Sequence, residues 1–134
     1  MAQAVKPLPF AYNALQGISE QVNKWHHDAH YAGYVNKRNE IETALETADR
    51  SKANANYSVY GELKRRETFN ASGQILHEYY WGMLGGDGSA DKSLGVVKKL
   101  EEDFGSFEKW REDFVACAKA SLGWTVVCFD HSDG

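Results

Sequence analysis

The sequence predicts an α+β protein that is mostly helical over the 134 residues present. Two long segments place apolar residues at helical spacing, and a short polar loop joins them. A glycine-rich stretch at 85–93 then separates these segments from a second region. That region begins with helical patterns and ends in a β-branched and aromatic run typical of a strand. We therefore expect an N-terminal helical hairpin domain over 1–84 and an incomplete α/β domain over 85–134.

An extended arm is expected before the hairpin, because Pro7 and Pro9 disfavour helix. Ser19 is a favourable N-cap for the first helix, which we expect from residue 18 to about 48. Gly33 suggests a bend within it. The helical pattern consists of Val22, Trp25, Ala29, Ile41 and Leu45.

The stretch at 49–58 is rich in small polar residues and is expected to form a loop. A second helix is predicted over 59–83, broken or newly capped near Asn70. Two long helices joined by a short loop form an antiparallel hairpin.

The second region carries two further helical stripes before its pattern changes. Ser106 is expected to cap the second of these helices. The stripes consist of Leu94, Val97, Leu100 and Phe104, followed by Phe107, Trp110, Phe114 and Ala118. The run at 124–129 predicts a strand, and Asp133-Gly134 is a typical hairpin turn.

Composition limits the functional classes. Hydrophobic residues make up 43% of the chain and aromatic residues 13%, which suits a folded core. The net charge of −4 argues against a dedicated nucleic-acid binder. The sequence has no apolar run long enough to span a membrane and no secretory signal pattern, so a cytoplasmic protein is expected. Cys117 and Cys128 form no metal-binding pair and are expected to be reduced, partly buried thiols.

The histidines are the most informative side chains. His26, His30 and Tyr34 follow one another at intervals of four residues, so they share one face of the first helix. On the second helix, His77 and Trp81 have the same spacing. In an antiparallel hairpin, imidazoles from both helices can meet at a common metal site. From spacing alone, structural hydrogen-bonding histidines remain an equal alternative, and zinc, copper, iron and nickel all remain open.

The chain resembles the iron/manganese superoxide dismutases in the order and spacing of its motifs. The resemblance runs from about residue 7 to the end and rests on the segments LPFAYNAL, WHHDAHYAGYV, TFNASGQILHEYYW, FGSFEKWREDF and GWTVV. It identifies the chain as a member of this family.

The resemblance implies one iron or manganese ion per subunit, held by three histidines and one aspartate. By position, His26 and His77 correspond to two of these four ligands. His30 and Tyr34 resemble the residues that flank the substrate channel and relay protons. Trp81 and Trp124 resemble the aromatic shell of the pocket. The implied reaction converts superoxide to dioxygen and hydrogen peroxide, in a homodimer or homotetramer with no nucleic-acid or membrane partner.

Two departures from the family pattern matter. Many iron enzymes of the family carry glutamine one turn before the second ligand, where this chain has Gly73, which resembles the manganese-like arrangement. The D-x3-H motif that supplies the remaining two ligands is absent from the sequence. Asp130 and His131 are adjacent and have the wrong spacing to replace it.

Three explanations of the missing motif remain open. The favoured one is that the sequence is a piece of a longer dismutase, because a strand that leads into a turn needs a partner strand. A partner subunit that donates the missing ligands is the second. A truncated, non-catalytic relative that acts as a helical binding or assembly module is the third.

Overall fold

Serine side chains cap three of the helices in the computed structural model, which describes residues 2–132. Helix α1 (Glu20–Lys24) begins at Ser19, whose hydroxyl accepts a hydrogen bond from the Val22 N–H. Ser58 and Ser106 do the same for α3 (Val59–Met83) and α5 (Phe107–Ala120). Each cap satisfies an N–H group that has no partner inside its own helix. The caps expected at Ser19 and Ser106 are therefore present.

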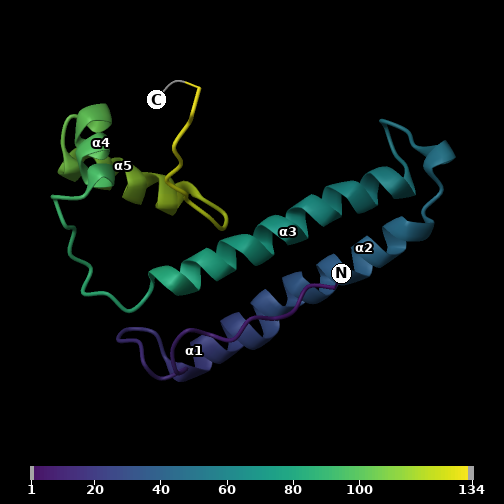
Figure 1. Ribbon diagram of the computed structural model, residues 1–134, viewed down its shortest axis with the longest axis horizontal. Coiled ribbons are helices and arrows are strands. Elements are labelled where there is room, and N and C mark those ends of the chain that lie inside the picture. Colours follow the sequence, from purple (N-terminus) through teal and green to yellow (C-terminus); the bar gives the residue numbers. More distant parts are fainter. Residues whose placement is uncertain (1, 133–134) are drawn as a thin grey trace. The chain divides into compact units, whose positions relative to one another are not determined.

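The first helix continues from α1 through a π-helical segment, η1 (Trp25–Tyr31), into α2 (Ala32–Thr47). A short 3-10 helix, η2 (Arg50–Lys52), lies in the polar loop that follows. Figure 1 shows α2 and α3 lying side by side as an antiparallel pair. The predicted hairpin and the mostly helical character of the chain are confirmed.

An extended N-terminal arm runs back along this first helix (Figure 1). Gln3 is held at both its backbone N–H and its C=O by the Asn39 side chain. Farther along, the Lys6 N–H donates to the Tyr31 hydroxyl at 3.1 Å. The arm therefore satisfies its backbone groups on helix side chains rather than on another strand.

The hairpin core lies where the arm, η1 and the C-terminal part of α3 meet. Tyr31, Val35 and Trp81 are buried there, and Leu8 and Phe10 from the arm pack against them. A second layer between α2 and α3 is formed by Ile41 and Leu45, which are also buried.

The chain divides into two compact units, Met1–Asp87 and Gly88–Gly134. The second unit contains α4 (Gly95–Phe104) and α5, which pack on each other. Gly105 ends α4 with a φ of 84°, a left-handed conformation that suits glycine at this position. Val97 and Leu100, from the predicted stripe, are buried.

One expectation about the helices was wrong. The predicted helix break near Asn70 is absent: α3 is continuous, and the Asn70 amide donates to the Arg66 carbonyl one turn earlier. This side-chain bond keeps the amide partnered inside the helix. The bend expected near Gly33 stays a prediction, and the structure shows a π segment just before that residue. Gly33 lies in regular α-helix.

The expected strand at 124–129 has no regular secondary structure. A strand needs a neighbouring strand to satisfy its backbone groups, and residues 2–132 contain no strand that could pair with it. The hairpin turn predicted at Asp133-Gly134 lies outside the described residues. Both cysteines are free, as expected, but exposed rather than partly buried. Within residues 2–132, no helix has the length and apolar character to cross a membrane.

Candidate metal centre

Three histidines meet between η1 and α3, at the end of the hairpin that also holds the core. His26 and His30 lie in η1, and His77 faces them from α3. Their potential ligand atoms all lie within 4.8 Å of one another. The two closest are the Nε2 atoms of His26 and His77, 3.1 Å apart. The sequence spacing therefore predicted correctly which imidazoles come together.

The π-helical segment gives the first two histidines an unusual backbone. In a π turn the N–H bonds to the carbonyl five residues back, an arrangement often found at functional sites. His26 and His30 lie within this segment, and their ring centroids are 5.5 Å apart. Both imidazoles reach the same side of the helix, where His77 lies.

His77 is held in one orientation. Its Nδ1 donates to the Gly73 carbonyl at 2.7 Å, and the side chain is 1% exposed. Because the carbonyl can only accept, the neutral imidazole carries its proton on Nδ1 and has a lone pair on Nε2. The His26 Nε2 lies 3.1 Å from this atom. The hydrogen bond from His77 Nδ1 to the Gly73 carbonyl leaves Nε2 for a metal, and such a bond on the other ring nitrogen is typical of metal-binding histidines.

Burial favours the neutral form of His26 and His77, which is the form that binds a metal ion. Burial, reinforced by the neighbouring His77 and His30, lowers the pKa of His26 from its ordinary value of 6.5 to about 4. Burial also lowers the pKa of His77, and the hydrogen bond to Gly73 opposes this only in part. A neutral imidazole at pH 7 keeps the lone pair that a metal ion needs.

Acidification is expected to destabilise the metal-free chain through His26. The unfolded chain takes up this proton near pH 6.5 and the folded chain only near pH 4. Between these values the unfolded state binds more protons, so the free energy of unfolding falls as the pH is lowered. Urea unfolding at several pH values measures this loss, and His26→Gln should reduce it. A wild-type pH dependence identical to that of the variant would contradict the assignment.

His30 and Tyr34 lie at the open side of the cluster. Their rings stack with centroids 5.2 Å apart, and His30 Nε2 lies 3.4 Å from the Tyr34 hydroxyl. His30 is exposed, so this pair links the half-buried His26 and the buried His77 to solvent. The Tyr34 ring also packs on Gly73: a Cβ added there would lie 2.4 Å from the nearest ring carbon.

Trp81 packs against His26 in the histidine cluster. It is 4% exposed, and its ring centroid lies 4.8 Å from that of His26. Trp124, the other aromatic residue expected in the pocket, belongs to the second unit. Its role there stays a prediction.

Sequence reasoning missed a polar hub beside the cluster. The Glu78 carboxylate accepts hydrogen bonds from Lys6 Nζ, the Tyr31 hydroxyl and Gln74 Nε2. Burial raises the pKa of Glu78, but these donors outweigh that effect and lower it overall. His27, which follows His26 in the sequence, is also held in place. Its Nδ1 pairs with the Asp28 carboxylate and its Nε2 with the Lys6 carbonyl. The arm thus fastens the segment that carries His26.

Replacing Glu78 with glutamine should lower the free energy of unfolding by about 1–3 kcal/mol. The new amide presents N–H groups to donors that need an acceptor. Denaturant unfolding checks this, with Glu112→Gln, an exposed position on α5, as the control. Equal stability of the two variants would show that the hub contributes little.

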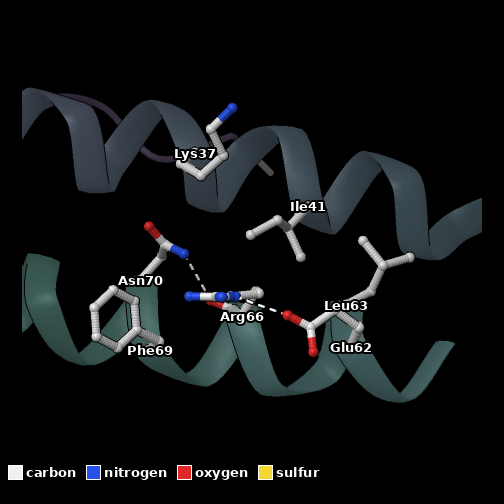
Figure 2. A pocket seen from close by; sticks show the side chains of 7 residues that line it. All are labelled: Lys37, Ile41, Glu62, Leu63, Arg66, Phe69 and Asn70. Atoms are coloured by element: carbon white, nitrogen blue, oxygen red, sulfur yellow. Dashed lines mark hydrogen bonds and ion pairs between the residues drawn. The ribbon is translucent and has the colours of Figure 1, made fainter. Parts of the chain in front are cut away.

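A separate groove of about 400 Å³ lies farther along α2 and α3 (Figure 2). Its walls include the apolar residues Ile41 and Phe69. Its cations already have carboxylate partners: Lys37 pairs with Glu40, and Arg66 with Glu62. The groove is therefore a weaker candidate for a functional site than the histidine cluster.

The hairpin matches a known protein family. Residues 3–85 match the family described as iron/manganese superoxide dismutases, alpha-hairpin domain. This range contains the whole histidine cluster.

The chain belongs to the iron/manganese superoxide dismutase family.

Some relatives of the chain are named as iron superoxide dismutases and others as manganese superoxide dismutases. The chain is 46% identical to a superoxide dismutase [Fe] of Aquifex aeolicus, over 90% of this chain and 58% of that protein. It is 40% identical to superoxide dismutase [Mn] 2 of Haloferax volcanii, over 97% of this chain and 64% of that protein. A superoxide dismutase [Fe] of Cupriavidus metallidurans is 35% identical over the whole chain and 68% of its own length. The chain thus spans about three fifths of the length of the first two superoxide dismutases.

Proposed function

We propose that this chain contributes to superoxide dismutation by supplying two ligands, His26 and His77, to one iron or manganese ion. The observation that carries the proposal is the 3.1 Å approach of their Nε2 atoms across the hairpin. Neutral imidazole suits iron, and a carboxylate in the same ligand set suits manganese. The family resemblance implies that an aspartate and a third histidine complete the set.

The donor atoms fit this role for a physical reason. His77 presents Nε2 because Gly73 holds Nδ1, and burial favours the neutral state of both rings. When bound, the metal supplies one-electron redox chemistry by alternating between the +3 and +2 states. Gly73 does not decide between iron and manganese, and the relatives are named for both.

The remaining site residues control protons and water. Two superoxide ions and two protons give one dioxygen and one hydrogen peroxide. His30 and Tyr34 link the interior to solvent and are suited to pass these protons inward. Trp81 excludes water from one side of His26, and Trp124 is proposed to extend this aromatic shell. A shell that excludes water sets the local dielectric and, through it, the redox potential of a bound metal.

The proposal includes a cytoplasmic homodimer or homotetramer, with the division into domains at about residue 84. The three relatives are named as enzymes, so the comparisons do not favour the non-catalytic helical module.

A chimera tests the proposal most simply. Residues 1–134 are joined to the C-terminal part of the Aquifex aeolicus protein that the alignment does not cover. We expect the chimera to hold about one iron ion per subunit and to consume superoxide. A folded chimera that dismutates superoxide equally well without His26 and His77 would overturn the proposal.

A further inference from the structure

The residue that follows each proposed ligand in the sequence is bonded to the N-terminal arm. His27 follows His26 in η1. Glu78 follows His77 in α3. Both are bonded to the same arm residue, Lys6. We propose that His27 and Glu78 are positioning residues, which act through Lys6 to set the separation of the two ligand imidazoles across the hairpin.

On the η1 side, the His27 imidazole holds the arm. Its Nε2 donates to the Lys6 carbonyl at 2.8 Å, and its Nδ1 pairs with Asp28 Oδ1 at 2.6 Å. The Tyr12 hydroxyl donates to the same carboxylate oxygen at 2.6 Å. His27 is 6% exposed, so its hydrogen bonds are shielded from water and costly to leave unmade. A buried ring bonded at both nitrogens has one orientation, and it fixes the backbone that also carries His26.

On the α3 side, the Glu78 carboxylate is connected to the same arm residue twice. Its Oε2 accepts directly from Lys6 Nζ, and its Oε1 accepts from the Tyr31 hydroxyl at 3.0 Å. That hydroxyl in turn accepts from the Lys6 backbone N–H at 3.1 Å. Tyr31 lies in η1 and is fully buried. The N–H, the C=O and the Nζ of one arm residue therefore join η1 to α3.

This junction lies next to the ligand pair on both helices. Consecutive Cα atoms are about 3.8 Å apart, so a displacement of His27 or Glu78 is passed directly to the neighbouring ligand. A functional site has to hold its groups to within about 0.5 Å, and the Nε2 atoms of His26 and His77 are 3.1 Å apart. Groups that orient a ligand typically contribute about 10–100-fold to metal affinity. Neither His27 nor Glu78 is itself a proposed ligand, so each acts through its neighbour.

The arm is also fastened at a second point, which provides a matched control. The Asn39 side chain bonds both the N–H and the C=O of Gln3. Asn39 lies on α2, roughly two helical turns beyond His30. Loss of these two bonds should loosen the same arm without moving the ligands. A positioning role can therefore be separated from a general contribution of the arm to stability.

The inference rests on the proposed function and is tested with the iron-loaded chimera. The rate at which a chelator removes iron and the electron paramagnetic resonance spectrum of the iron(III) form both report on the ligand positions. We expect His27→Ala to lose iron at least about tenfold faster and to change that spectrum. His27→Gln, whose amide can still donate to the Lys6 carbonyl, should recover most of the retention. Asn39→Ala should keep the wild-type spectrum and lose iron within about twofold of the wild-type rate.

A double variant tests the connection through Lys6. Glu78→Ala should also speed the loss of iron, because it removes both links from α3 to the arm residue. Combined with His27→Ala, it should lose iron no more than about threefold faster than the worse single variant, since either change alone already releases Lys6. Rates that multiply would show that the two groups act independently and would contradict the connection.

The contrary outcomes separate this inference from the proposed function. Urea unfolding of the metal-free 134-residue chain, followed by circular dichroism, gives the stability of each variant. If Asn39→Ala and His27→Ala speed iron loss equally for an equal loss of stability, the arm acts through stability alone and the inference is wrong. Wild-type retention and spectrum in His27→Ala, with iron lost in His26→Ala, would remove the positioning role and leave the proposed function standing. A wild-type chimera that holds no iron would overturn the proposed function and this inference with it.

Discussion

Replacing His77 with alanine is expected to remove the metal ion and the dismutase activity of the chimera together. His77 is 1% exposed and is the donor that α3 contributes to the cluster. Without it, α3 contributes no imidazole to the cluster. Changes to groups that merely orient a ligand cost about 10–100-fold, so loss of a ligand should cost on the order of a hundredfold or more.

Metal content by mass spectrometry and superoxide consumption should be measured on the same samples. The control is Tyr79→Phe, an exposed position on the same helix, which should keep both the ion and the rate. A His77→Ala chimera that retains a full metal complement and its rate would show that the metal lies elsewhere.

Replacing Gly73 with alanine should destabilise the hairpin and displace Tyr34. The added methyl group would lie 2.4–2.8 Å from three atoms of the Tyr34 ring, well inside contact distance. Such overpacking costs about 1–3 kcal/mol. The opposing gain from the better helix former is only about 1 kcal/mol. Because Tyr34 stacks on His30, dismutation by the chimera should also fall.

Gly82 provides a matched control in the same helix. A Cβ there meets no atom within 4 Å, so Gly82→Ala should raise the free energy of unfolding by about 0.5–1 kcal/mol. Opposite signs for the two substitutions in denaturant unfolding would support the packing argument. A stabilising Gly73→Ala with unchanged activity would refute it.

The hairpin and its histidines could be predicted because the signals are local. Ser19 and Ser106 cap helices by contacts with residues three positions away. The spacing of His26 and His30 specifies a shared helix face whether the backbone is α or π. For the same reason, that spacing could not reveal the π segment.

Features that depend on distant residues were not predictable. The Glu78 hub needs Lys6, which is 72 positions away in the sequence. The continuous α3 was missed for a local reason instead: Asn70 is a poor helix former, but its side chain bonds to the Arg66 carbonyl one turn earlier. The run at 124–129 has strand composition, but strand formation depends on a pairing partner rather than on composition.

The position of the metal ion itself is the most direct test of this account. Crystals of the iron-loaded chimera should be measured at the iron absorption edge, where anomalous scattering locates the ion. We predict one strong peak per subunit, bonded to Nε2 of both His26 and His77. A peak bonded to neither histidine would contradict the central claim.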